Sequence, residues 1–211
     1  MQGEHRKGSL GVRAASAAAL TLALLTACAS GPQLDAQWSD PAAAPSLLRG
    51  ARVLVACDAG ELVLRQICQD QLASEVVARG ATAVFVPPST PIALDRSLDQ
   101  QLLPAARDAA AKAILVMTVA VAVQDVSPGF SIGIGGFGFG SHSAGGIGVA
   151  APIGGGRVTS GYAGNGRVTD VASGRLVWTA KATSPPSGDV AAQMAELARI
   201  VVGSADNAGL F

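Results

Sequence analysis

The stretch from residue 52 to residue 86, RVLVACDAGELVLRQICQDQLASEVVARGATAVFV, decides the fold. It opens with Arg52–Cys57, a short apolar run rich in β-branched residues that is typical of a buried strand. It closes with a second such run, Ala81–Val86. The residues between them have helical periodicity and end at Gly80, the residue type that commonly follows a helix. The sequence therefore predicts a right-handed strand–helix–strand unit, which belongs to the α/β class.

The sequence also predicts where this helix begins and which of its faces is buried. Asp58 and Glu61 stand three residues apart and predict a capping box at the helix N-terminus. The helix then runs to Arg79. Its apolar residues fall on one face, which we expect to pack on the sheet: Leu64, Ile67, Cys68, Leu72 and Val76.

The next segments extend the same alternation of helix and strand. Ser97–Ala111 is rich in Ala and Leu and predicts a helix that is interrupted or restarted at Pro104. Lys112–Val123 is a long apolar run with many β-branched residues. It is shorter than the roughly 18–20 residues that a membrane-spanning helix needs, so a central strand is the better interpretation.

A glycine cluster occupies Pro128–Gly156. Apolar residues alternate with small ones on both sides of Gly135-Gly136, a pattern that predicts a bulged β-hairpin. Residues 133–138 match GxGxxG, but a dinucleotide site needs a helix after the loop and more glycines follow here. Ser141-His142-Ser143 is interpreted as the solvated tip of the hairpin, since adjacent residues in a loop do not orient a nucleophile and its base.

The last third of the chain predicts an antiparallel strand pair and a helix. Arg157–Asp170 and Arg175–Thr183 form the pair, joined by a turn that ends at Gly174. Asp189 caps a helix that runs to about Val202. We therefore expect residues 49–211 to form a single mixed-sheet α/β sandwich with a Gly-rich antiparallel hairpin and a C-terminal helix.

The first 27 residues read as a lipoprotein signal peptide. A basic segment is followed by the apolar run Ala14–Leu25 and then by Leu25-Thr26-Ala27-Cys28. These four residues resemble the lipobox of bacterial lipoproteins, which implies that the leader is cleaved before Cys28 and that the Cys28 thiol carries a diacylglycerol. The alternative is a cleaved, unanchored secretory protein. Ala29 follows Cys28 where an Asp would signal retention in the inner membrane, so we expect the periplasmic face of the outer membrane.

Residues 28–48 contain many Pro, Ala and Ser residues and predict a lipidated N-terminus and a flexible tether. Trp38 is unusual in such a segment. Docking of Trp38 on the domain is the simpler interpretation, and contact with a partner is the alternative.

Cys57 and Cys68 remain once Cys28 is acylated. An oxidising periplasm favours a disulfide between them. A helix beginning near Ala59 would place Cys68 about 13 Å along its axis from the strand, too far for a bridge, whereas a start near Leu62 would close the gap. A disulfide and two buried thiols both stay open.

Charge and composition exclude several function classes. The chain has 15 basic and 15 acidic residues; the leader holds three of the basic and one of the acidic, which leaves 12 and 14 and a net charge of −2. No basic patch with interleaved aromatics predicts nucleic-acid binding. Two histidines in the whole chain predict neither a metal site nor a general base, so we expect no cofactor and no catalytic residues.

The mature chain resembles a set of uncharacterised proteobacterial lipoproteins. The resemblance is carried by Trp38-Ser39-Asp40-Pro41, the RVLVAC strand, Gly80 at the end of the first helix, the AKAILVMTV strand from Ala111, the Gly-rich hairpin, and Asp170…Ser173-Gly174-Arg175-Leu176-Val177-Trp178. A wider similarity is to periplasmic α/β modules of envelope-assembly lipoproteins, including activators of cell-wall synthases and the curli secretion channel subunit. The resemblance implies a binding or assembly role and carries no catalytic residues.

Two functions are therefore expected from the sequence. The first is a lipid-anchored, non-enzymatic binding or scaffold module in the periplasm, held to the membrane by its anchor and bound to an envelope protein. The alternative is an oligomeric outer-membrane pore or secretion component that uses the Gly-rich hairpin 130–153.

Overall fold

The computed structural model describes residues 31–86, 97–126, 130–132 and 158–211. Contacts divide the chain into Met1–Gly31 and Pro32–Phe211, and the following concerns the second unit. Its elements in chain order are β1 (Gln33–Ser39), β2 (Arg52–Asp58), α2 (Leu62–Ala78), β3 (Thr82–Phe85), α3 (Leu98–Asp108), β4 (Ala113–Val126), β5 (Phe130–Ile132), β6 (Val158–Asp170), β7 (Leu176–Thr183) and α4 (Val190–Asn207).

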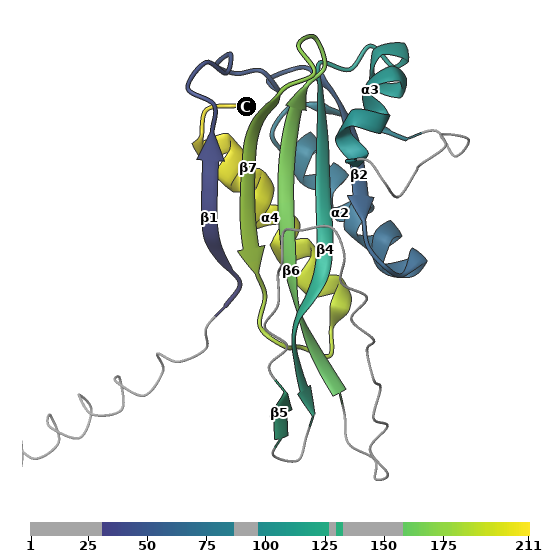
Figure 1. Ribbon diagram of the computed structural model, residues 1–211, viewed down its shortest axis with the longest axis vertical. Helices are drawn as coiled ribbons and strands as arrows, with labels where there is room; N and C mark the ends of the chain where they lie inside the picture. The colour runs from purple at the N-terminus through teal and green to yellow at the C-terminus, as the bar shows by residue number, and fades with distance from the viewer. Residues whose placement is uncertain (1–30, 87–96, 127–129, 133–157) are drawn as a thin grey trace, which may run out of the picture. The chain divides into compact units, whose positions relative to one another are not determined.

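The strands form one mixed, open sheet in the order β1-β7-β6-β4-β2-β3, with β5 paired to the end of β4 (Figure 1). β2 lies parallel to β3 and β4, as a strand–helix–strand unit requires. β6, β7 and β1 continue the sheet in antiparallel pairs. The predicted fold class, an α/β sandwich with a mixed sheet and a C-terminal helix, is confirmed.

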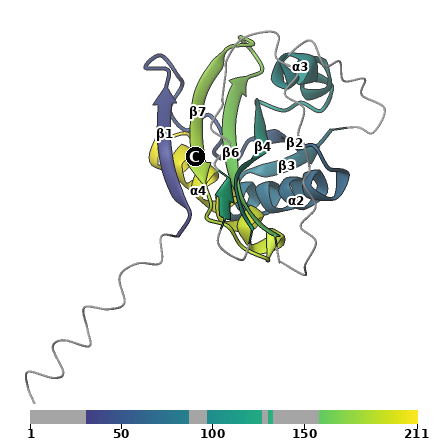
Figure 2. The ribbon, with the colours of Figure 1, turned by 60° about the horizontal axis from the view of Figure 1, so that its bottom comes forward.

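Helices lie on both faces of the sheet (Figure 2). α2 and α4 pack on one face over the larger core, and α3 packs on the other face over a smaller core. β2 serves both cores because its side chains alternate: Val53 and Val55 face α2 and α4, and Leu54 and Ala56 face α3. This double burial explains the unbroken apolar run in the sequence of β2.

Glycines in β6 let α4 approach the sheet closely. A Cβ at Gly166 would overlap Cγ1 of Val201 in α4 and lie 3.3 Å from Cζ3 of the buried Trp178. A Cβ at Gly164 would lie 3.2 Å from the sulfur of Met117. The glycine face of β6 is therefore a packing surface.

Three local expectations are corrected. Gln33–Ser39, predicted as part of the tether 28–48, forms β1 and pairs with β7. The capping box is wrong: α2 begins at Leu62, and its N-cap Glu61 makes no side-chain cap hydrogen bond. α3 continues through Pro104 without interruption. Pro104 is solvent-exposed, so its ring and missing N–H are accommodated on the outer face of the helix.

Other expectations hold. The carboxylate of Asp189 accepts a hydrogen bond from Ala192 N at 2.9 Å and caps α4, which runs on to Asn207. Gly80 and Gly174 have φ of +80° and +67°, the left-handed conformation that suits glycine after a helix and in a turn.

Most of the Gly-rich hairpin 130–153 lies outside the described residues. Its first residues, Phe130–Ile132, pair back on β4 as β5. The GxGxxG match and Ser141-His142-Ser143 fall outside the described part, and the pore hypothesis stays a prediction. Among the described helices, none has the length and hydropathy required to cross a bilayer.

Candidate functional site

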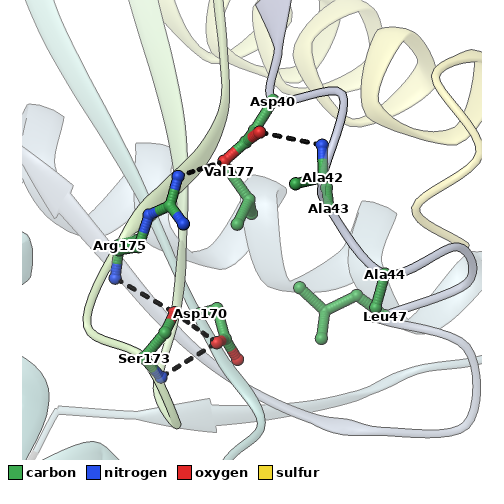
Figure 3. A pocket seen from close by; sticks show the side chains of 9 residues that line it. All are labelled: Asp40, Ala42, Ala43, Ala44, Leu47, Asp170, Ser173, Arg175 and Val177. Carbon is green, nitrogen blue, oxygen red and sulfur yellow. Dashed lines mark hydrogen bonds and ion pairs between the residues drawn. The ribbon is translucent and has the colours of Figure 1, made fainter.

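A cavity of about 240 Å³ lies between the segment after β1 and the turn that joins β6 to β7 (Figure 3). Two segments that are far apart in the sequence form its walls. The lining residues are Asp40, Ala42, Ala43, Ala44, Leu47, Asp170, Ser173, Arg175 and Val177.

Asp40 joins the two walls. Its backbone N–H donates to Val177 O at 2.8 Å and extends the pairing of β1 with β7 by one residue. Its carboxylate accepts hydrogen bonds from Ala42 N at 2.9 Å and from Arg175 Nη2 at 2.8 Å. The Asp40 side chain is 10% exposed, whereas that of Arg175 is 68% exposed. The ion pair therefore buries the acid and presents the rest of the guanidinium to solvent.

Asp170 shapes the opposite wall. The Ser173 hydroxyl and the N–H groups of Ser173 and Ala172 donate hydrogen bonds to its carboxylate. Burial alone would raise the pKa of Asp170, but these hydrogen bonds outweigh burial and hold the pKa below its ordinary value of 3.8. Asp170 is thus kept ionised and fixes the turn that carries Arg175.

The loop that follows Asp40 is held by the end of the chain. Ser46 N donates to Gly209 O at 2.8 Å and Leu48 N donates to Leu210 O at 2.7 Å. Arg49 Nη2 donates to the backbone oxygen of Phe211, also at 2.8 Å. These bonds preform the cavity wall that contains Leu47.

The cysteines singled out from the sequence lie elsewhere. Cys57 at the end of β2 and Cys68 in α2 form a disulfide with a Cα–Cα distance of 6.0 Å. The bridge is reachable because α2 begins at Leu62, the later of the two helix starts considered. Cys28 lies outside the described residues, and neither Cys57 nor Cys68 lines the cavity.

The residues of the cavity were not predicted as a site, although a signal was present. Asp40 belongs to the Trp38–Pro41 motif, and Asp170, Ser173 and Arg175 belong to the second motif that carried the family resemblance. Taken as sequence alone, both motifs indicate structure and no site. Their convergence on one cavity depends on the pairing of β1 with β7, which the interpretation of residues 28–48 as a tether precluded.

A second polar cluster has a structural explanation. Asp99 in α3 is 2% exposed and accepts hydrogen bonds at 3.0 Å from both Arg167 and Thr169 of β6. The carboxylate is paired within the fold, so this cluster fastens α3 to the sheet. Among the described residues, no group of three or more His, Cys, Asp and Glu side chains is placed to hold a metal ion.

Comparison with solved structures finds partial likenesses to two bacterial proteins. The PelC dodecamer from Paraburkholderia phytofirmans matches at 16% identity, covering 80% of this chain and 96% of that chain, with a TM-score of 0.46. Its L103M variant gives 16% identity, coverage of 80% and 94%, and a TM-score of 0.48. Lipoprotein GNA1162 from Neisseria meningitidis matches at 13% identity, covering 74% of this chain and 99% of that chain, with a TM-score of 0.42. No family model matches the chain, and no curated protein does.

Proposed function

We propose that this chain is a non-enzymatic binding module of the bacterial cell envelope, anchored through Cys28 at the periplasmic face of the outer membrane, and that the cavity around Arg175 receives part of a protein partner. The observation that carries the proposal is the cavity itself. It is preformed by two segments of the chain, and it places one exposed cation beside an apolar wall.

The size of the cavity favours a protein partner over a small molecule. Sites for small molecules usually enclose about 300–1,000 Å³. A volume of about 240 Å³ suits one or two side chains of a partner. Leu47 and Val177 supply apolar contact, and the exposed guanidinium of Arg175 supplies a charge-assisted hydrogen bond. Because Asp40 and Asp170 also line the cavity, the matching partner segment has an uncharged hydrogen-bond acceptor for Arg175 next to an apolar side chain.

The anchor rests on the lipobox residues Leu25–Cys28. Two or three acyl chains hold a protein stably at a bilayer, whereas one alone does not. Labelling of cells with a palmitate analogue tests this part: the wild-type chain takes up label and Cys28→Ser does not. Absence of label on the wild-type chain would contradict the anchor.

Site-specific photocrosslinking tests the binding site. A photoreactive amino acid at Ala44, an exposed residue of the cavity wall, should capture one protein in intact cells. The matched control places the same group at Ala78, which is exposed at the end of α2 and does not line the cavity. Mass spectrometry identifies the adduct.

Arg175→Gln decides whether the captured protein uses the site. This change removes the charge and keeps a side chain of similar reach, so the Ala44 adduct should fall several-fold while chain abundance stays constant. An Ala44 adduct that is unchanged in Arg175→Gln, or that also forms at Ala78, would contradict the proposed site.

A further inference from the structure

One end of the domain is built entirely from described residues. The end of β1, the starts of β2, β3 and β4, and the ends of α2 and α3 meet there with the turn between β6 and β7. The connections between these elements at this end all fall within the described ranges. Figure 1 shows the end of β1, the start of β4 and the β6–β7 turn together at the top of the molecule. The cavity lies here, so we call this end the cavity end.

Two exposed cations are neighbours on the sheet at the cavity end. The backbone N–H of Lys112 donates to the carbonyl oxygen of Arg52 at 2.8 Å, and the carbonyl oxygen of Lys112 accepts from Val171 N at 3.0 Å. Lys112 is thereby held between the start of β2 and the turn that follows Asp170, a residue of the cavity wall. Because adjacent strands lie about 4.8 Å apart, the backbones of Arg52 and Lys112 lie within about 10 Å of that turn.

Arg107 adds a third exposed cation to this pair. It lies in the last turn of α3, five residues before Lys112. A cation suits the C-terminus of a helix, which explains Arg107 and gives no reason for Arg52 or Lys112. None of the three forms an ion pair with a described residue, and the exposed acid beside them is Asp108. We call Arg52, Arg107 and Lys112 the basic cluster.

The remaining acids at the cavity end already have partners within the fold. Asp40 pairs with Arg175, and Glu75 and Asp206 both pair with the arginine at the end of α2. Asp170 accepts hydrogen bonds from its own turn. At the opposite end of the domain the exposed described acids are Asp35, Asp58, Glu61 and Asp189. Charge is therefore separated along the domain, and the cavity end presents positive charge to an approaching molecule.

An interface built around the cavity also covers the basic cluster. An ordinary protein–protein interface buries about 800 Å² on each partner, the area of a disc about 30 Å across. Such a disc, centred on the cavity, extends past the turn at Asp170 to Arg52 and Lys112. Inside the cavity Asp40 and Asp170 disfavour a carboxylate of the partner, whereas outside it the basic cluster attracts one. This matches the usual arrangement of an interface, in which charged residues lie at the rim.

We propose that the protein partner of the cavity bears acidic residues around the segment that enters it, and that the basic cluster docks these residues. This inference rests on the proposed function, because it names the chemistry of the same partner. Charge pairs at the rim speed association and select the partner, and the cavity holds it. A protein fits better than an anionic lipid or polysaccharide, because the cluster borders a cavity of the size of one or two side chains.

A carbodiimide tests this chemistry directly, because it joins a lysine amine to a carboxylate as an amide with no spacer. The protein captured through the photoreactive group at Ala44 is purified as the covalent complex, which is then treated with carbodiimide and digested. Mass spectrometry locates the amides formed by Lys112. Lys181, whose side chain is 44% exposed and which lies in β7 away from the cavity, is the control lysine within the same chain.

We expect an amide between Lys112 and an Asp or Glu of the captured protein, and none between Lys181 and that protein. A captured protein that forms no amide with Lys112 would overturn the inference while leaving the proposed function intact. Absence of any adduct at Ala44 would instead contradict the proposed function and, with it, the inference. An adduct that contains no polypeptide would assign the cavity end to an anionic lipid or polysaccharide and also overturn it.

A matched pair of double variants measures the contribution of the cluster. Arg52→Gln with Arg107→Gln removes two exposed cations beside the cavity and should lower the Ala44 adduct several-fold. Arg65→Gln with Arg199→Gln removes two exposed cations elsewhere, in α2 and α4, and should leave the adduct unchanged. Chain abundance is compared in parallel. Equal adduct yields from the two double variants, at equal abundance, would overturn the inference.

Discussion

Arg175 Nη2 lies 2.8 Å from Asp40 Oδ2, and this ion pair joins residues 135 positions apart in the sequence. It connects the end of the edge strand β1 to the turn between β6 and β7. Because Asp40 is almost fully enclosed and Arg175 is mostly exposed, the two residues contribute differently: the acid organises the wall of the cavity, and the cation is presented to solvent.

The Asp40–Arg175 pair should show measurable coupling. Asp40→Ala, Arg175→Ala and the double variant should give an interaction free energy of about 1 kcal/mol in urea unfolding, because the enclosed carboxylate loses its charged partner. The control is the Glu196–Arg199 pair of α4, which is exposed on both sides and should give less than about 0.5 kcal/mol. Equal coupling in the two cycles would show that the enclosure of Asp40 has no energetic effect.

Asp170 should make the free energy of unfolding depend on pH. A carboxyl whose pKa is lowered by folding contributes stability that is present above its unfolded value, 3.8, and is lost as the pH falls through the lowered pKa. The urea midpoint of the wild-type chain should therefore drop as the pH falls below 3.8, and Asp170→Asn should drop less over the same range. Parallel curves for the two proteins would exclude this role of Asp170.

Gly166→Ala should destabilise the domain by about 1–3 kcal/mol, since the new methyl group overlaps Val201 and forces α4 outward. Gly60→Ala is the control, because a Cβ at Gly60 has no neighbour within 4 Å. Adding Val201→Ala to Gly166→Ala should restore part of the loss. If the two glycine variants unfold at the same urea concentration, close packing of α4 on β6 is not needed for stability.

The buried carboxylate of Asp99 offers a further test. Asp99→Ala leaves Arg167 and Thr169 without their acceptor and should lower the free energy of unfolding by about 1–3 kcal/mol. Asp99→Asn keeps an oxygen acceptor and should lose less. Calorimetric unfolding compares the two variants, and a loss from Asp99→Asn as large as that from Asp99→Ala would mean that charge and not hydrogen bonding fastens α3.

The Cys57–Cys68 bridge should stabilise the domain by about 2–3 kcal/mol, because it closes a short loop in the unfolded chain. Replacing both residues by Ala removes this contribution without leaving a free thiol. Alkylation of the unfolded wild-type chain, followed by mass measurement, should modify neither cysteine until a reductant is added. Modification without reductant would favour the two buried thiols that the sequence also allowed.

Local patterns in the sequence predicted most of the fold. These patterns depend on residues close together in the sequence, so they can be recognised before the fold is known. They are the apolar runs of β2 and β4, Gly80 after α2 and the Asp189 cap of α4. β1 gave no such signal. Its side chains are all exposed, and it is a strand only because β7, more than 130 residues further on, offers it an edge.

The cavity could not be predicted for the same reason, since it depends on contacts between residues far apart in the sequence. Asp40 and Arg175 are ordinary charged residues in polar segments, and neither shows a local pattern that indicates a site. The capping box failed for a different reason: α2 begins at Leu62, so Glu61 is the N-cap residue and not the fourth residue of the box, and its side chain makes no cap hydrogen bond.

The place of β1 at the edge of the sheet has a consequence for the order in which the domain is completed. Synthesis runs from Gln33 toward Phe211, so β1 is the first strand made, yet β7, its partner in the sheet, is the last. Until β7 has been made, β1 exposes both of its hydrogen-bonding edges. The wall that contains Asp40 therefore forms only once β7 and the C-terminal residues Gly209 and Leu210, which bond the loop after Asp40, are in place.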